Sequence, residues 1–374
     1  MASNRSLAQI AAYNEEHIKS LDWKDHIRTR PGMYIGKQGD GSQENDGIYL
    51  LFKEVIDNSI DEFLMGAGKN IKVAVSNGTL SVRDYGRGIP HGKMIECVAQ
   101  INTGAKYDTG AFYRSVGLNG VGTKAVNALS TSFVIESFRE GRVKRAEFSR
   151  GKLLKEHPIL PSKKPDGTRV EFSPDPSIFP GYKFNGQFLE NRLWNYAFLN
   201  RGLRLHFEHQ VIFSKKGLLD LLGRETQGLA LYAPIHQVSD SIEFTLTHTD
   251  SYGESYLSFV NGQYTPEGGT HQAAFREGIL KALKEYYGKQ VDPSDARSGI
   301  VGAILIRIHE PVFESQTKTK LGSTHVLENG TSIRSWIVEF VRERIVTFLH
   351  KNPQISKGIL TKLRRNERER KDLA

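Results

Sequence analysis

Cysteine is almost absent from this 374-residue chain, in which Cys97 is the single example. One cysteine excludes disulfides within the chain and any metal site built from several thiolates. Long hydrophobic runs are also lacking, because the most apolar stretch, residues 299–308, is only about half of a membrane span. Residues 1–19 are polar and do not resemble a signal peptide. These absences predict a cytoplasmic protein with no membrane partner.

Three common enzyme signatures are missing as well. The P-loop pattern G-x-x-x-x-G-K-[ST] does not occur, which argues against a P-loop nucleotide site. The patterns H-E-x-x-H and G-x-S-x-G are absent too, which weakens metalloprotease and serine-hydrolase interpretations. Any enzymatic function must therefore depend on other residue patterns.

The composition is that of a globular protein, with 38% hydrophobic and 25% charged residues. A chain of 374 residues is long enough for two hydrophobic cores. The net charge of +9 favours a polyanionic partner, of which nucleic acid is the commonest. Charge alone leaves this partner undecided, since many basic proteins bind no nucleic acid.

Residues 47–67 predict an amphipathic helix, because apolar residues from Ile48 to Phe63 recur at helical spacing. The opposite face gathers acidic and amide side chains, namely Glu54, Asp57, Asn58, Asp61 and Glu62. We identify no basic partner four residues away, so ion pairing along the helix does not explain this stripe. A merely solvated helix face is the alternative interpretation for Glu54.

A β-hairpin is predicted next, because alternating apolar residues flank Asn77-Gly78, a strong hairpin-turn signal. Its second strand leads into a segment rich in glycine and proline, which contains Asp84, Gly86, Arg87, Gly88 and Pro90. Asp84 could serve simply as the side chain of an Asx turn. A second glycine-rich stretch ends before a helix predicted to begin at Thr123.

Two α/β domains are expected, with residues 1–214 in the first and residues 215–374 in the second. Strand patterns dominate residues 133–172 of the first domain. In the second domain, strands are predicted at 241–247, 256–261 and 301–309, and helices at 216–222, 273–287, 333–350 and 357–371. Residues 227–238 are predicted to form a connection without regular structure.

The order of these motifs resembles the Bergerat (GHKL) ATP-binding fold. The series consists of the acidic helix Glu54–Glu62, then Asp84-x-Gly86-x-Gly88, the loop Gly117–Gly122, and Gly167-Thr168. Within that superfamily, further segments are similar to the B subunits of DNA gyrase and topoisomerase IV, namely Arg30–Gly36, Gly268–His271 and Gln316–Leu321. The resemblance covers essentially the whole chain. It implies an ATP-binding α/β sandwich followed by a ribosomal-S5-like transducer domain.

The resemblance implies a Mg-ATP site in the first domain. Asp84 would accept the adenine amine, Gly86 and Gly88 would let the backbone pass close to the base, and Pro90 is a further ATP-binding candidate. Glu54 would orient and deprotonate the attacking water, and Asn58 would offer an oxygen to Mg²⁺. Backbone amides at the start of a helix would hold the phosphates, from the loop Val116, Gly117, Leu118, Asn119, Gly120, Val121 and Gly122.

The resemblance also implies roles beyond that core. Lys318, a catalytic candidate, and Gln316 would reach the γ-phosphate from the second domain, and Tyr13 would insert into the nucleotide site of a second copy. Lys106 and Thr168 are further candidates for the nucleotide pocket. Arg139 would lie at the rim where aminocoumarins bind. The remaining pair, Glu62 and Arg87, is predicted to form a structural salt bridge.

Three positions depart from the family pattern and concern the rate of hydrolysis. Val116 and Asn119 stand where many relatives have Gly and His, and Tyr85 follows Asp84 where a polar residue is usual. Asparagine still donates to phosphate, so we expect activity to be retained.

The family implies an ATP-hydrolysing gate of a type II DNA topoisomerase that dimerises on ATP binding. Its further partners would be a DNA duplex and a DNA-cleaving subunit. Nothing after Lys357 resembles the acidic cleavage-assisting cluster of the family, so we expect ATP hydrolysis without strand passage. A MutL-like mismatch-repair ATPase and a non-catalytic DNA-binding module remain alternatives, and the sequence does not separate gyrase from topoisomerase IV.

Overall fold

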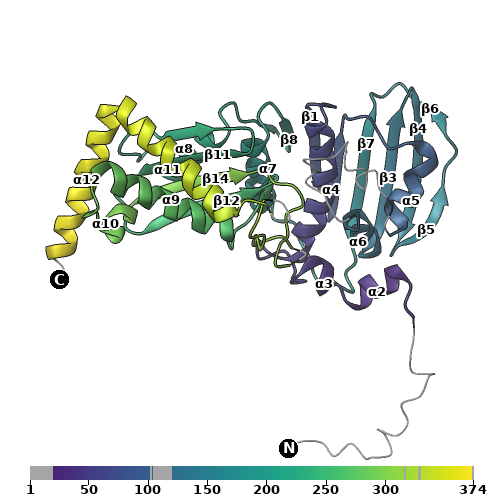
Figure 1. The fold of residues 1–374 in the computed structure, drawn as a ribbon. Helices are drawn as coiled ribbons and strands as arrows, with labels where there is room; N and C mark the ends of the chain where they lie inside the picture. Colours follow the sequence, from purple (N-terminus) through teal and green to yellow (C-terminus); the bar gives the residue numbers. More distant parts are fainter. Residues whose placement is uncertain (1–19, 102, 104–119, 316, 327–329, 373–374) are drawn as a thin grey trace, which may run out of the picture.

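The structure, a computed structural model, describes residues 20–101, 103, 120–315, 317–326 and 330–372. Its two β-sheets each carry their own helices and form two lobes (Figure 1). Across the described residues, every helix is too short or too polar to span a bilayer.

The first lobe contains seven helical segments, if the short turn η2 is included, and nine strands in the described part. Its helical segments are α2 (Trp23–Thr29), α3 (Gly32–Ile35), α4 (Gly47–Leu64), η2 (His91–Lys93), α5 (Met94–Ala99), α6 (Gly122–Ala128) and α7 (Gly186–Leu199). Its strands are β1 (Asn70–Ser76), β2 (Thr79–Asp84), β3 (Ser130–Arg139), β4 (Arg142–Ser149), β5 (Lys152–Glu156), β6 (Leu160–Pro161), β7 (Gly167–Pro174), β8 (Arg204–Phe207) and β9 (Gln210–Ile212). Helix α8 (Leu218–Thr226) follows and packs on the second sheet.

The first sheet has the strand order β5-β4-β3-β7-β2-β1-β8-β9, with β6 paired to β4. Only β1 and β8 among these neighbours run parallel. The predicted hairpin is confirmed, because β1 pairs antiparallel with β2 and places Asn77 and Gly78 at φ 49° and 77°. Both φ values lie in the left-handed region that a type I′ turn requires.

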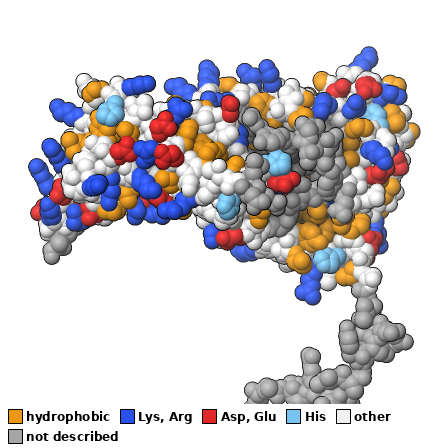
Figure 2. Space-filling view, viewed as in Figure 1, with side chains coloured by type: hydrophobic (Ala, Val, Ile, Leu, Met, Phe, Trp, Pro, Cys, Tyr) orange, Lys and Arg blue, Asp and Glu red, His pale blue; other side chains and the backbone are white. Residues whose placement is uncertain are grey.

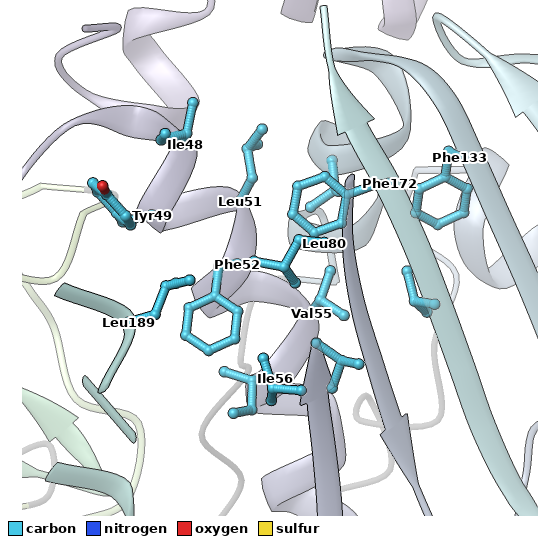
Figure 3. Close-up of a cluster of buried hydrophobic side chains, with 14 of the residues drawn as sticks. Ile48, Tyr49, Leu51, Phe52, Val55, Ile56, Leu80, Phe133, Phe172 and Leu189 are labelled. Atoms are coloured by element: carbon cyan, nitrogen blue, oxygen red, sulfur yellow. The ribbon is translucent and has the colours of Figure 1, made fainter. Parts of the chain in front are cut away.

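Helix α4 forms the centre of the first core. Its apolar stripe is buried, with Phe52 and Ile56 at 0% exposure. Figure 3 shows these side chains between Leu189 of α7 and sheet residues such as Leu80 of β2. The sheet face away from the helices is polar, and there Glu136 and Arg169 form an ion pair at 3.0 Å. One helix-covered face and one polar face are typical of an antiparallel sheet.

The second lobe is built on a five-stranded sheet of order β10-β11-β14-β12-β13. Its strands are β10 (Ile235–Val238), β11 (Ile242–His248), β12 (Glu254–Val260), β13 (Gln263–Tyr264) and β14 (Ile300–Ile306). Its helices are α9 (Thr270–Tyr287), α10 (Pro293–Arg297), α11 (Ile333–Lys351) and α12 (Pro353–Asp372), of which α9 and α11 pack side by side (Figure 1).

Strand β14 is covered on both faces, which explains its continuous apolar sequence. Ala303 and Leu305 pack with α7 and α8, whereas Ile304 and Ile306 belong to the core formed with α9 and α11. The alternation follows from the two-residue period of a strand. Because α8 packs on this sheet while α7 packs on the first, the two helices join the lobes.

Two sequence-based expectations are wrong in detail. The acidic stripe of α4 does have a basic partner four residues away, since Lys53 Nζ lies 2.7 Å from Asp57 Oδ2. Nor is the whole stripe solvated, because Asp57 and Asp61 are 1% and 3% exposed. Lys53 lies at the edge of the acidic face of α4 and is not one of its acidic or amide residues. The spacing of those residues therefore does not reveal the ion pair between Lys53 and Asp57. Within the segment predicted as a plain connection, residues 227–238, the structure contains strand β10.

Candidate nucleotide site

Asp84 ends β2 with its carboxylate buried at 5% exposure. Its Oδ1 accepts hydrogen bonds from the backbone N–H groups of Gly86 at 2.9 Å and Thr168 at 3.0 Å. Ser59 of α4 donates to Oδ2 at 3.3 Å. Burial raises the pKa of Asp84, and the two amide hydrogen bonds oppose that rise. Since a carboxylate has about four acceptor positions, Oδ2 retains capacity for one further donor.

The segment after Asp84 approaches its neighbours too closely for side chains. A Cβ at Gly86 would lie 2.7 Å from Glu62, and one at Gly88 would lie 2.5 Å from the Phe138 carbonyl oxygen. Gly88 also has φ 69°. Glycine is therefore required at both positions. The hydrogen bond from the Gly86 N–H to the Asp84 carboxylate closes an Asx turn. The interpretation of Asp84 as an Asx-turn residue is therefore confirmed, and it is compatible with a binding role.

The predicted Glu62–Arg87 ion pair is present and fixes this segment to α4. Arg87 Nη2 lies 2.8 Å from Glu62 Oε1, and Arg87 Nε lies 3.0 Å from Oε2. The Arg87 backbone N–H also donates to Oε2 at 2.9 Å. This bidentate arrangement holds the loop in place.

Glu54 and Asn58 of α4 meet the beginning of α6. A Cβ at Gly122 would collide with the Glu54 carboxylate, so the two groups are in close contact. Asn58 Nδ2 donates at 2.9 Å to both the Glu54 carbonyl oxygen and Thr123 Oγ1. The structure thus brings together the predicted base, the predicted magnesium ligand and the predicted phosphate-binding helix start.

Lys124 was missed by sequence reasoning. It is 3% exposed and donates to the backbone carbonyl oxygens of Gly120 and, at 2.7 Å, Thr103. Gly120 itself has φ 59°. The lysine therefore ties the end of the glycine-rich loop to α6, a role that its position two residues after Gly122 could have suggested.

Arg139, the predicted rim residue, lies at the end of β3. Its Nη1 lies 3.4 Å from the Gly88 carbonyl oxygen, and its Nε pairs with Glu140. Pro90 precedes the turn η2, at the outer end of the same loop. Several predicted residues lie outside the described part of the chain: Tyr13, Lys106, Val116, Gly117, Leu118, Asn119 and Gln316.

Lys318 comes from the second lobe and is 5% exposed. Its charge acts on Asp57, the buried residue beside Asn58 on α4. Burial alone would raise the pKa of Asp57, but the Lys53 and Lys318 ammonium groups hold that pKa below its usual range. The predicted γ-phosphate lysine is thus found next to α4, where the first lobe carries its catalytic candidates.

A cavity of about 620 Å³ opens between the two lobes beside this cluster. Residues of both lobes line it, including Lys53 and Tyr196 from the first and Gln263, Thr317 and Thr319 from the second. Neither Asp84 nor Gly86 is among its lining residues, so it adjoins the candidate nucleotide site without being part of it.

Family models divide the chain in the same order as the two sheets. Residues 43–178 match the family described as "Histidine kinase-, DNA gyrase B-, and HSP90-like ATPase", and residues 212–374 match "DNA gyrase B". The 43K ATPase domain of Thermus thermophilus gyrase B, solved with an aminocoumarin, superposes with a TM-score of 0.71. That match has 30% identity and covers 94% of this chain and 98% of the Thermus chain. The chain belongs to the DNA gyrase B and topoisomerase IV B family.

Curated members of the gyrase B and topoisomerase IV B family match along nearly the whole chain. The B subunit of DNA topoisomerase 4 from Borreliella burgdorferi is 48% identical over 97% of this chain. The DNA gyrase B protein of Clostridium acetobutylicum is 34% identical over 94%. The chain spans 59% and 58% of these two proteins. The predicted fold class, a GHKL ATPase fold followed by a gyrase-B-type transducer, is confirmed.

Proposed function

We propose that this chain binds and hydrolyses Mg-ATP as the gate of a type II DNA topoisomerase. The observation that carries the proposal is the contact between Glu54 and the start of α6 at Gly122. A carboxylate held beside the N–H groups at the start of a helix can accept a proton from a water molecule next to bound phosphate. Family membership supplies the ATP-binding fold around that contact.

Adenine would be recognised at Asp84, whose Oδ2 retains acceptor capacity for the exocyclic amine. Pairing a buried carboxylate with a donor offsets part of the burial cost that raises its pKa. Gly86 and Gly88 keep this segment packed against Glu62 and the Phe138 carbonyl oxygen, which holds the backbone beside Asp84. Thr168 orients Asp84 through its backbone N–H.

Hydrolysis would use Glu54 as the general base. Asn58 would hold Mg²⁺ through its side-chain oxygen, because its nitrogen donates to Glu54 and Thr123. When bound, the metal neutralises charge on the phosphates. Lys318, from the second lobe, would contact the γ-phosphate, so that the second lobe distinguishes ATP from ADP.

The complete assembly would contain two copies closed by ATP, a DNA duplex and a DNA-cleaving partner. Figure 2 shows Lys and Arg side chains over both lobes, interspersed with acidic ones, which suits contact with a polyanion. We place the domain division near residue 214, between β9 and α8, and the protein in the cytoplasm. The higher identity to a B subunit of topoisomerase IV, 48% against 34%, favours that branch.

Steady-state ATP hydrolysis against protein concentration tests the proposal. For the wild type we expect a rate that rises faster than linearly, because dimerisation completes the site. Glu54→Ala should lower the rate by about 10²–10⁴-fold while nucleotide still binds. Glu310→Ala, which removes an exposed carboxylate outside the site, should leave it unchanged.

An aminocoumarin should inhibit the wild type, and Arg139→Ala should weaken that inhibition, because Arg139 lies at the rim of the site. Tight nucleotide binding without turnover in the wild type would contradict the hydrolytic role of Glu54. It would favour the non-catalytic module instead.

A further inference from the structure

The segment Gly268–His271, which carries part of the family resemblance, forms a tight turn into the start of α9. Both of its glycines have positive φ, 72° at Gly268 and 131° at Gly269. A side chain at either position would be strained, so this backbone favours glycine. The Gly268 N–H donates to the Thr265 carbonyl oxygen at 2.9 Å, which closes the turn. None of these residues belongs to the candidate nucleotide site.

Backbone hydrogen bonds connect this turn to the residues that follow Lys318. The Glu267 N–H donates to the Thr319 carbonyl oxygen at 3.1 Å. The Leu321 N–H donates to the Gly268 carbonyl oxygen, also at 3.1 Å. Thr319 is the next residue after Lys318, so its Cα lies only about 3.8 Å from that of the lysine. The turn therefore holds the chain immediately beside the proposed γ-phosphate contact.

The start of α9 continues this attachment. The Thr270 N–H donates to the Leu321 carbonyl oxygen at 3.4 Å, and the Thr270 hydroxyl donates to the Ser323 carbonyl oxygen at 2.8 Å. Gly269 approaches Leu321 so closely that a Cβ would lie 2.4 Å from the leucine carbonyl oxygen and 2.7 Å from its nitrogen. Leu321 is 1% exposed and belongs to the core of the second lobe. The segment after Lys318 is thus held against α9 and fixed in a packed core.

Lys318 itself ends a second tight turn. Its N–H donates to the Ser315 carbonyl oxygen at 3.0 Å, and its backbone is left-handed, with φ 57°. Such a conformation in a lysine costs free energy and persists only where the surroundings hold it. Thr317 and Thr319 line the cavity between the lobes, so open space adjoins this turn. The backbone bonds to Glu267–Thr270 therefore contribute to holding the turn in place.

We propose that Gly269 and Thr270 are positioning residues for Lys318, because they fix the chain from which the lysine reaches the nucleotide. The inference rests on the proposed function, in which Lys318 contacts the γ-phosphate. A displacement of Leu321 away from α9 moves Lys318 as well, since the two residues are close in the chain. A diphosphate lacks the group that Lys318 contacts and is therefore insensitive to this displacement. A change at Gly269 or Thr270 thus alters discrimination between ATP and ADP rather than nucleotide binding in general.

The test measures the ratio of affinities for a non-hydrolysable ATP analogue and for ADP, by calorimetry on the 374-residue chain. Gly269→Ala places a Cβ against the Leu321 backbone and forces the two segments apart. We expect the triphosphate-to-diphosphate affinity ratio to fall by about 10-fold or more, since one hydrogen bond to a charged group contributes at this level. ADP affinity should change little.

Gly253→Ala is the matched control for backbone strain. Gly253 lies in the same lobe and has φ 84°, but nothing lies within 4 Å of its Cβ position. The substitution therefore introduces a side chain at a positive φ without a collision. It should retain the wild-type ratio.

Substitutions at Thr270 test the same attachment without a collision. Thr270→Val keeps the shape of the side chain and removes the hydrogen bond to Ser323, so the ratio should fall by about 3-fold. Thr270→Ser keeps the hydroxyl and should restore the wild-type ratio. This pair preserves a test if Gly269→Ala does not fold, which thermal unfolding will reveal.

A background without the two side chains proposed to reach the γ-phosphate assigns the effect to them. In Gln316→Ala/Lys318→Ala the ratio should already be low, and adding Gly269→Ala should lower it no further. A further fall would overturn the inference, because Gly269 would then position some other group.

The outcomes separate the two proposals. If the wild type binds neither nucleotide, or if Gln316→Ala/Lys318→Ala keeps the wild-type ratio, the proposed function fails at this contact, and the inference with it. If that double variant lowers the ratio but Gly269→Ala and Thr270→Val do not, the proposed function stands and the inference is overturned. Equal losses of affinity for both nucleotides in Gly269→Ala would show a purely structural role and would overturn it as well.

Discussion

Gly122 is the residue whose replacement should be most informative about the site. It is the first residue of α6, and a Cβ there would collide with the Glu54 carboxylate. Alanine is otherwise favourable in a helix, so its intrinsic effect on stability is small. The consequence of the change would therefore lie in the position of Glu54.

We predict that Gly122→Ala lowers ATP hydrolysis by about 10²-fold, because a shift of about 1 Å in a catalytic group has this effect. Thermal unfolding should change little. Gly92→Ala is the matched control, since Gly92 lies in η2 near the same loop with nothing within 4 Å of its Cβ position. Equal rates for Gly122→Ala and the wild type would show that Glu54 tolerates displacement and is not the base.

At the scale of elements, Asp175 ties α2 to the first sheet. Arg28 of α2 and Arg150 each donate to its Oδ2 at 2.8 Å, and Ser177 donates to Oδ1. Burial raises the pKa of Asp175, but these donors outweigh it and lower the pKa to about 2. Arg28 also donates to the Ala128 carbonyl oxygen at the end of α6. Through this carboxylate, α2 is fixed beside the helix that begins at the site.

Asp175→Asn should lower the free energy of unfolding at pH 7 by roughly 2 kcal/mol, because a pKa lowered from 3.8 to about 2 corresponds to that amount. Since the folded-state pKa lies below the unfolded value, this stability exists above about pH 4 and is lost as the pH falls to about 2. Urea unfolding of both proteins at several pH values measures it. A difference that persists unchanged at pH 2 would contradict the charge-based explanation.

At the scale of the whole molecule, the second lobe contains two buried histidines that favour the neutral form. Burial lowers the pKa of His248 to about 4 and that of His271 to about 3. His248 bonds to Tyr232 and, at 3.0 Å, to the Ala296 carbonyl oxygen, and His271 bonds to Thr265. Protonation of either ring would break this arrangement, so acid should act on the second lobe.

We predict that the second lobe loses stability as the pH falls from about 6.5 to about 4, because the unfolded chain binds these protons first. Hydrogen exchange of β11 and α9, compared with β1 and α4, measures the effect for each lobe. His248→Gln should reduce the pH dependence in that window. Equal acid sensitivity of both lobes, unaffected by the substitution, would contradict this account.

Local patterns sufficed for much of the first lobe. The helix of residues 47–64 and the hairpin at Asn77-Gly78 follow from spacing and turn chemistry, which depend on near neighbours in the sequence. The order of Glu54, Asp84 and the glycine loop indicated the ATP-binding fold because each motif is short and local. Lys53 and Lys124 were missed, since their importance depends on partners that no local pattern identifies.

The sequence by itself determined main elements such as helix α4 and the β1–β2 hairpin, and the residue types at the candidate site. Only the tertiary structure decided how Asp57 is used, because its partners Tyr196 and Gln263 lie 139 and 206 residues away. It also decided that the charge of Lys318, from the second lobe, helps to lower the pKa of Asp57 on α4. Burial converts these distant side chains into one polar cluster, since a charge removed from water must find its counter-charge wherever the fold brings one.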